Sequence, residues 1–221
     1  MNLAQGLERR LENLADGASA SLFRGRMHPV AIATRLIRQL EFMATDTPAG
    51  PRVPNELVVY MNPADIDPAV DRSQLTRELE NTVTETSLEK GWRLDGAVAV
   101  HVRTDGETPR GIVECRGEVK PSALPQWCQL IADDGSAVLA ISLNRTIVGR
   151  ALDCDIRIAN QEVSRYHCLL YREGDRTFLH DRGSSNGTFI NGLRLATRPE
   201  PVIVGDNVML GNLSFTFRAV G

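Results

Sequence analysis

Short polar and cationic side chains recur in the predicted turns of the second half of the chain, and their types suit the binding of an anion. Arg150 follows a glycine, Ser164 and Arg165 stand 14 and 15 positions later, and Ser185-Asn186 lies in a further turn. An arginine fork and hydroxyls match the oxygens of a phosphate ester, which carries about −1.5 to −2 charges and three strong acceptors. Each piece also has a plainer interpretation as a turn, because Asn-Gly pairs are typical of hairpins.

Catalytic and metal chemistry is not indicated. The four histidines show no HxxH or HExxH spacing, and the four cysteines show no CxxC spacing, so we expect no catalytic residue, metal or cofactor and interpret the cysteines as reduced core thiols. Asp153 and Asp155 are close in sequence, but they fit a turn and a strand start better than an acid–base pair. The cysteines are Cys115, Cys128, Cys154 and Cys168, and the histidines are His28, His101, His167 and His180.

The elements that would position these side chains are short strands. After residue 126 the helical period disappears, and short apolar runs alternate with glycine, asparagine and aspartate turns, a pattern typical of a β-sandwich. The predicted strands are 127–132, 137–143, 146–149, 155–158, 166–171, 177–180, 188–190, 202–203, 207–210 and 213–218.

The first half mixes helices and strands. Leucines and alanines between Leu3 and Leu22 recur at steps of three and four, which predicts an amphipathic helix. A second helix begins at Pro29 and a third after Asp71, which suits a helix N-cap. Strands are expected at 56–61, 97–103 and 111–119, with the last two forming an antiparallel hairpin, so the outline is α-α-β-α-β-β.

Length and composition agree with two small domains. The 221 residues are 42% hydrophobic and 24% charged, with a net charge of −3, which excludes wholesale disorder. Neither half is basic, and this argues against nucleic-acid binding. The N-terminus lacks the apolar core of a signal peptide and no stretch is long enough to span a membrane, so we expect a cytoplasmic protein. The predicted boundaries are an α+β domain at 1–118, a linker at 119–125 and an all-β sandwich at 126–221.

The order of the motifs in the second half resembles the forkhead-associated (FHA) domain. Gly149-Arg150 is followed by D-I-x-I at 155–158, by V-S-R-x-H at 163–167 and by L-x-D-x-x-S-x-N-G-T-F-I-N-G at 179–192, so the resemblance covers about residues 127–219. It implies a sandwich that binds phosphothreonine peptides through the loops at one end.

The resemblance also implies roles for individual residues. Arg150 and Ser164 would contact the phosphate, Ser185 would place a hydroxyl near it, and Asn186 would bond the peptide backbone. Arg165 would either contact phosphate or read a residue beyond the phosphothreonine. His167 would support the Ser164 loop, while the remaining motif positions would be structural: Gly149, Gly187, Thr188, Asn191 and Gly192. Asn191 is also explained as a turn residue alone.

The first half resembles the domain found upstream of FHA modules in actinobacterial and related bacterial proteins. His28-Pro29-x-x-Ile32-Ala33, Val53-Pro54-Asn55 and Gly91-Trp92 carry this resemblance. It implies a non-catalytic adaptor in Ser/Thr-kinase signalling that binds a phosphothreonine protein (a kinase, pseudokinase or kinase substrate), holds a second protein at its N-terminal domain, and serves cell-wall synthesis or growth.

Two other interpretations stay open. One is a nucleic-acid-associated or scaffold protein whose FHA domain serves intramolecular or oligomeric contacts. The other concerns Thr82, Thr84 and Thr86, which stand beside glutamates and form either a kinase substrate segment or the polar side of a helix.

Overall fold

The computed structural model describes residues 27–66 and 71–220. The chain divides into two compact units, Met1–Thr45 with Arg52–Ser122 and Asp46–Pro51 with Ala123–Gly221. The division after residue 122 falls inside the expected linker, whereas the assignment of 46–51 to the second unit was not expected. The helix predicted between Leu3 and Leu22 lies outside the described residues. No helix in the described part of the chain is both long and apolar enough to cross a membrane.

The second and third expected helices of the first unit are present, the third with the predicted Asp71 cap. Helix α2 (Pro29–Met43) begins with a proline, which has no N–H to leave unsatisfied at this position. The carboxylate of Asp71 accepts from the amides of Ser73 and Gln74 in α3 (Arg72–Lys90), and Gly91 ends that helix at a φ of 65°. A short 3-10 helix, η1 (Pro63–Asp65), follows the first strand.

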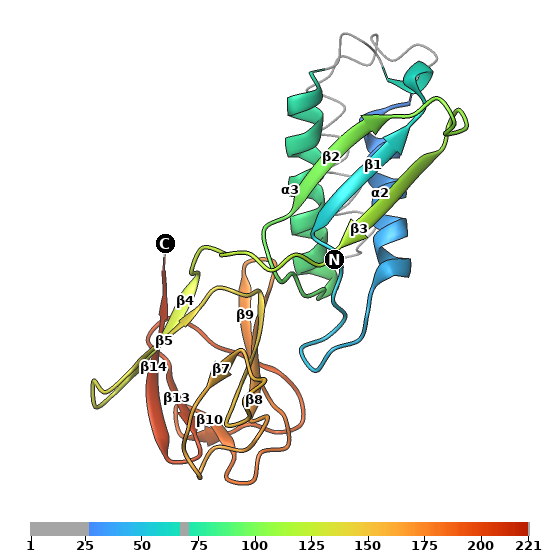
Figure 1. The fold of residues 1–221 in the computed structure, drawn as a ribbon. Coiled ribbons are helices and arrows are strands. Elements are labelled where there is room, and N and C mark those ends of the chain that lie inside the picture. The colour runs from blue at the N-terminus through green and yellow to red at the C-terminus, as the bar shows by residue number, and fades with distance from the viewer. Residues whose placement is uncertain (1–26, 67–70, 221) are drawn as a thin grey trace. The chain divides into compact units, whose positions relative to one another are not determined.

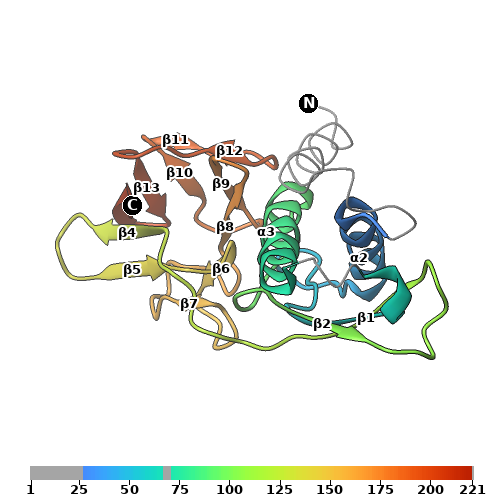
Figure 2. The same cartoon turned by 90° about the horizontal axis from the view of Figure 1, so that it is seen from above.

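The sheet of the first unit has the order β2-β1-β3, with both helices on one face (Figure 1, Figure 2). Strand β1 (Glu56–Met61) pairs parallel with β2 (Ala99–Thr104) and antiparallel with β3 (Val113–Glu118). The predicted hairpin between the last two strands is therefore wrong. Alternate residues of β1 are completely buried, and we attribute the central place of β1 in the sheet to this burial. The connection at 105–112 between β2 and β3 is long enough for the two strands to lie on opposite sides of β1.

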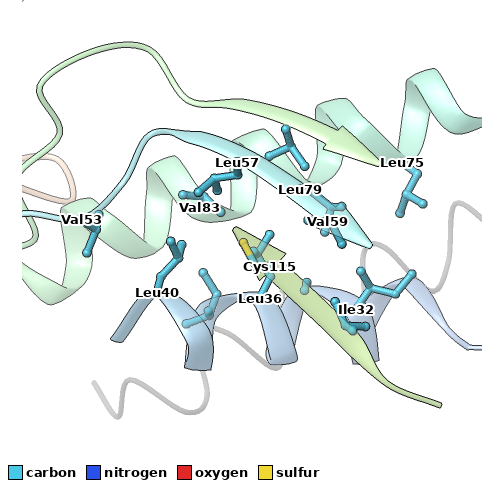
Figure 3. Close-up of a cluster of buried hydrophobic side chains, with 14 of the residues drawn as sticks. Ile32, Leu36, Leu40, Val53, Leu57, Val59, Leu75, Leu79, Val83 and Cys115 are labelled. Atoms are coloured by element: carbon cyan, nitrogen blue, oxygen red, sulfur yellow. The ribbon is translucent and has the colours of Figure 1, made fainter. Parts of the chain in front are cut away.

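One apolar core joins the helices to the inner face of this sheet. Figure 3 shows Leu36 and Leu40 of α2 and Leu79 of α3 directed at Leu57 and its neighbours on β1. All four leucines are at most 1% exposed. Burying each such side chain contributes about 1.5–3 kcal/mol relative to exposure, so this cluster holds the two helices on the sheet.

Two of the three threonines of the α3 segment are buried, and Thr84 is half-buried. Thr82 and Thr86 are 7% and 3% exposed, and the Thr82 hydroxyl donates to the carbonyl of Glu78. A kinase therefore cannot reach Thr82 or Thr86 in the folded chain, and these two residues do not form a polar outer face either.

The second unit is a β-sandwich, as predicted. One sheet has the order β11-β10-β13-β14-β4-β5 and the other β12-β9-β8-β6-β7. Their inner faces share a core that includes Leu130, Leu170 and Leu210. The strands are β4 (Cys128–Ala132), β5 (Val138–Ile141), β6 (Arg145–Gly149), β7 (Ile156–Arg157), β8 (Cys168–Glu173), β9 (Arg176–Asp181), β10 (Thr188–Ile190), β11 (Leu193–Arg194), β12 (Glu200–Pro201), β13 (Asn207–Leu210) and β14 (Leu213–Ala219).

Several details of this unit differ from expectation. Strands β11 and β12 were not predicted, and the segment predicted as a strand at 202–203 is irregular.

All four cysteines of the chain are free and buried, as expected for core thiols. Within the second unit, Ala49 packs in a small cluster with Ile147, Leu169 and Tyr171.

Candidate functional site

Three loops meet at one end of the sandwich because of how their strands pair. Strand β8 runs antiparallel to both β6 and β9. The end of β6, the start of β8 and the end of β9 therefore lie at the same edge. Arg150 follows β6, Ser164 and Arg165 precede β8, and Ser185-Asn186 lies between β9 and β10. The structure thus brings all five sequence-predicted binding residues to one loop cluster.

Ser164 joins two of these loops directly to its own. Its carbonyl accepts from the Arg150 amide at 2.9 Å, and its hydroxyl oxygen accepts from the Ser185 amide at 3.0 Å. The hydroxyl hydrogen has no acceptor within the described residues. It is therefore free to donate to a ligand.

The Arg150 guanidinium is held at its base and exposed at its tip. Its Nε donates to the carbonyl of Val163 at 3.2 Å, while the residue as a whole is exposed. Arg165 is also exposed, and its guanidinium makes no hydrogen bond or ion pair to another described residue. Two exposed cations and a hydroxyl donor thus lie on neighbouring loops, a set of groups that suits a phosphate dianion.

His167 lies below the loops and is fully buried. Its Nδ1 accepts from the Ser164 amide at 3.0 Å, so Nε2 carries the hydrogen and donates to the Gly187 carbonyl at 3.1 Å. Burial lowers the pKa of the imidazole, with the Gly187 bond and Asp181 opposing part of this shift. The neutral ring therefore ties the Ser164 loop to the Gly187 turn.

Asp181 organises the third loop, a role that the sequence analysis did not assign although its L-x-D motif contains the residue. One carboxylate oxygen accepts from the hydroxyls of Ser184 and Thr188 at 2.5 and 2.6 Å. The other accepts from the amides of Gly183 and Ser184. Partial burial acts to raise the pKa of Asp181, but these hydrogen bonds outweigh it and hold the pKa below its ordinary value.

Two glycines of the motif occupy places that a side chain cannot. A Cβ on Gly149 would stand 2.2 Å from the carbonyl oxygen of Arg165, because β6 and the Arg165 loop approach closely there. Gly187 has a φ of 87°, in the region that favours glycine.

Gly192 follows Asn191, whose side-chain oxygen accepts from the Asn207 amide at 2.9 Å. Asn191 therefore links β10 to β13, at a turn where its own φ is 50°.

A carboxylate that the sequence analysis missed lies within the cluster. The side-chain amide of Asn186 donates to the main-chain carbonyl of Glu162 at 3.0 Å and to its carboxylate at 2.8 Å. Nothing in the sequence distinguishes Glu162 from an ordinary turn residue, because the contact spans 24 positions between two loops.

Neither of the two aspartates weighed for acid–base chemistry stands apart as a free carboxylate. Asp153 accepts from the Tyr166 hydroxyl at 2.5 Å, and Asp155 accepts from the Ile147 amide at 2.8 Å. These bonds fix the loop between β6 and β7. Among the residues that the structure describes, no group of three or more His, Cys, Asp or Glu side chains is arranged to hold a metal ion.

Comparison with protein families identifies both parts of the chain. Residues 146–211 match the FHA domain, so the loop cluster belongs to an FHA β-sandwich. Residues 4–116, just over half of the chain, match the FhaA N-terminal domain. The chain therefore belongs to the FhaA N-terminal domain family and carries an FHA domain after it. Neither match is to an enzyme family.

Individual relatives match a part of the chain. The mouse (Mus musculus) proliferation marker protein Ki-67 is 36% identical over 87 residues, which are 38% of this chain and 3% of that protein. The human angiogenic factor with G patch and FHA domains 1 is 33% identical over 92 residues, 38% of this chain and 13% of that protein. The chain thus spans a small part of the curated relatives it matches.

A solved structure of the FhaA FHA domain, complexed with the intracellular domain of Rv3910, is 29% identical. It covers 41% of this chain and 99% of its own, with a TM-score of 0.38.

Proposed function

We propose that this chain is a non-catalytic bacterial signalling adaptor whose FHA domain binds phosphothreonine on a partner of a Ser/Thr kinase. One observation carries the proposal: the Arg150, Ser164 and Ser185 loops are hydrogen-bonded to one another through Ser164, and they carry an exposed guanidinium and a free hydroxyl donor. The FHA family match supports the same ligand.

In this proposal Arg150 and Ser164 hold the phosphate, and Ser185 adds a third donor beside them. Asn186 bonds the peptide backbone. Arg165 contacts either the phosphate or a residue beyond the phosphothreonine. His167 and Asp181 keep the loops in place without touching the ligand.

The partner is a kinase, a pseudokinase or a kinase substrate, and the N-terminal domain holds a second protein. From its family resemblance, we infer that the protein acts in the bacterial cytoplasm. The process that it serves is cell-wall synthesis or growth. The alternative of an FHA domain used for oligomeric contacts is favoured by no particular observation on the described residues.

The test is capture of partners by the full chain from a bacterial lysate, followed by mass spectrometry. The lysate is divided and one half is treated with phosphatase. We expect a set of proteins that is captured only from the untreated half and only by the wild type, with the Arg150→Ala, Ser164→Ala double variant as the comparison. Capture of the same proteins from both halves would contradict the proposal.

A further inference from the structure

The contact between Glu162 and Asn186 places a carboxylate beside the residue that we expect to hold the peptide backbone. Both side chains are exposed, so either is free to bond water. The Asn186 amide nevertheless donates twice to Glu162, at 3.0 and 2.8 Å. A side-chain amide has two N–H donors, so this contact uses the full donor capacity of Asn186 and leaves its oxygen as the acceptor.

The main chain fixes Glu162 at this place. Its amide donates to the Asn160 side chain at 2.8 Å, and the next two residues bond Arg150 and Ser185. The carboxylate is therefore presented by the same short segment that organises the phosphate donors. Glu162 forms no ion pair with any residue that the structure describes, so its charge is not neutralised locally.

This arrangement has a consequence for any peptide that needs an Asn186 donor. To donate to a peptide carbonyl, the amide must give up one of its two contacts with Glu162, either the main-chain carbonyl or the carboxylate. When the carboxylate is released, it lies beside the bound peptide without its partner. A lysine or arginine of the peptide can replace the amide as that partner, whereas an acidic residue adds repulsion.

We propose that Glu162 is a specificity-determining residue that selects a basic side chain close to the phosphothreonine and disfavours an acidic one. This inference rests on the proposed function. The phosphate site does not create this preference, because Arg150 and Arg165 attract acidic side chains of the peptide and repel basic ones. The selectivity expected from Glu162 is therefore the reverse of the one expected from the neighbouring phosphate site.

The test is a charge scan of one phosphothreonine peptide. Lys, Ala or Glu is placed singly at each of the three positions on either side of the phosphothreonine, and affinities for the full chain are measured by isothermal titration. We expect one position, or two adjacent ones, at which Lys binds about three- to tenfold more tightly than Glu. The difference should decrease as salt is raised, because exposed charges are screened.

Glu162→Gln is the informative variant because glutamine keeps the length and an acceptor for Asn186 while losing the charge. We expect it to abolish the Lys-over-Glu preference and to retain tight binding of the phosphorylated peptide. Asp175→Asn is the matched control, since it removes one negative charge in the exposed turn between β8 and β9, at the opposite end of β8 from the site.

The outcomes separate this inference from the proposed function. Phosphate-dependent binding with no charge preference in the wild type, or with a preference that Glu162→Gln retains, would overturn the role of Glu162 and leave the proposed function intact. Equal binding of the phosphorylated and unphosphorylated parent peptides would overturn both.

Discussion

Ser164 is hydrogen-bonded to three other residues of the candidate site and so connects them. Its amide donates to His167 below, its carbonyl accepts from Arg150 on one side, and its hydroxyl accepts from Ser185 on the other. Arg150 and Ser185, which we expect to touch the phosphate, are exposed and Ser164 is half-buried, whereas the histidine that positions Ser164 is fully buried. Recognition and stability should therefore respond to different substitutions.

Replacing Arg150 should weaken binding with little effect on folding. Loss of one partner of a charge-assisted pair costs about 2–5 kcal/mol of binding, so Arg150→Ala should bind phosphothreonine peptide at least about tenfold more weakly. The melting temperature should stay close to that of the wild type, because the exposed guanidinium makes one side-chain hydrogen bond to a described residue. Arg218→Ala, an exposed position on β14, is the control for charge. Normal binding by Arg150→Ala would place the phosphate site elsewhere.

His167→Ala should show the reverse. The Ser164 amide and the Gly187 carbonyl lose their partner, so the free energy of unfolding should fall by about 1–3 kcal/mol. Peptide binding should weaken as a consequence. A variant that melts like the wild type but cannot bind would move His167 to the recognition surface.

The same residue predicts a pH dependence of stability. Burial lowers the pKa of His167 in the folded chain. The unfolded chain, in which a histidine has a pKa of about 6.5, therefore binds the proton more readily. The stability from the neutral ring is present above that value and is lost as pH falls through the folded pKa. Urea unfolding between about pH 7 and pH 5 should therefore show a smaller loss of stability in His167→Ala than in the wild type. Identical slopes would contradict this account.

At the scale of elements, the site depends on how closely β6 approaches the loop before β8. Gly149→Ala would put a methyl group against the Arg165 carbonyl oxygen, at a distance of 2.2 Å before any adjustment. Main-chain atoms would have to move, so we expect both a lower melting temperature and weaker peptide binding. Gly106→Ala is the control, because its Cβ would meet nothing within 4 Å. An unchanged Gly149→Ala would show that the approach is not needed.

Sequence patterns predicted elements better than their partners. The helix start at Pro29, the Asp71 cap and the strand at 56–61 each depend on neighbouring residues, and the structure confirms all three. The antiparallel hairpin failed because pairing depends on which strand is most completely buried, and β1 lies between β2 and β3. The motif order likewise predicted which loops carry Arg150 and Ser164. The Glu162–Asn186 contact joins two loops and left no local pattern.

At the scale of the whole molecule, each unit has its own apolar cluster. We therefore propose that the two halves fold independently. Fragments 1–122 and 123–221 should each give dispersed amide spectra and a cooperative melt. The second fragment lacks residues 46–51 of its unit and so loses the packing of Ala49 on Ile147 and Leu169. It should be less stable than the corresponding part of the full chain, and an unfolded fragment would contradict independent folding.

The central claim is that this chain binds phosphothreonine peptides selectively, and one measurement tests this claim most directly. The full chain is titrated calorimetrically with three versions of one peptide taken from a captured partner, bearing phosphothreonine, phosphoserine or unmodified threonine. We expect the phosphothreonine peptide to bind most tightly, with phosphoserine weaker because it lacks a methyl group worth on the order of 1 kcal/mol when buried. The unmodified peptide should show no measurable binding. Equal affinity for the phosphorylated and unmodified peptides would contradict the account.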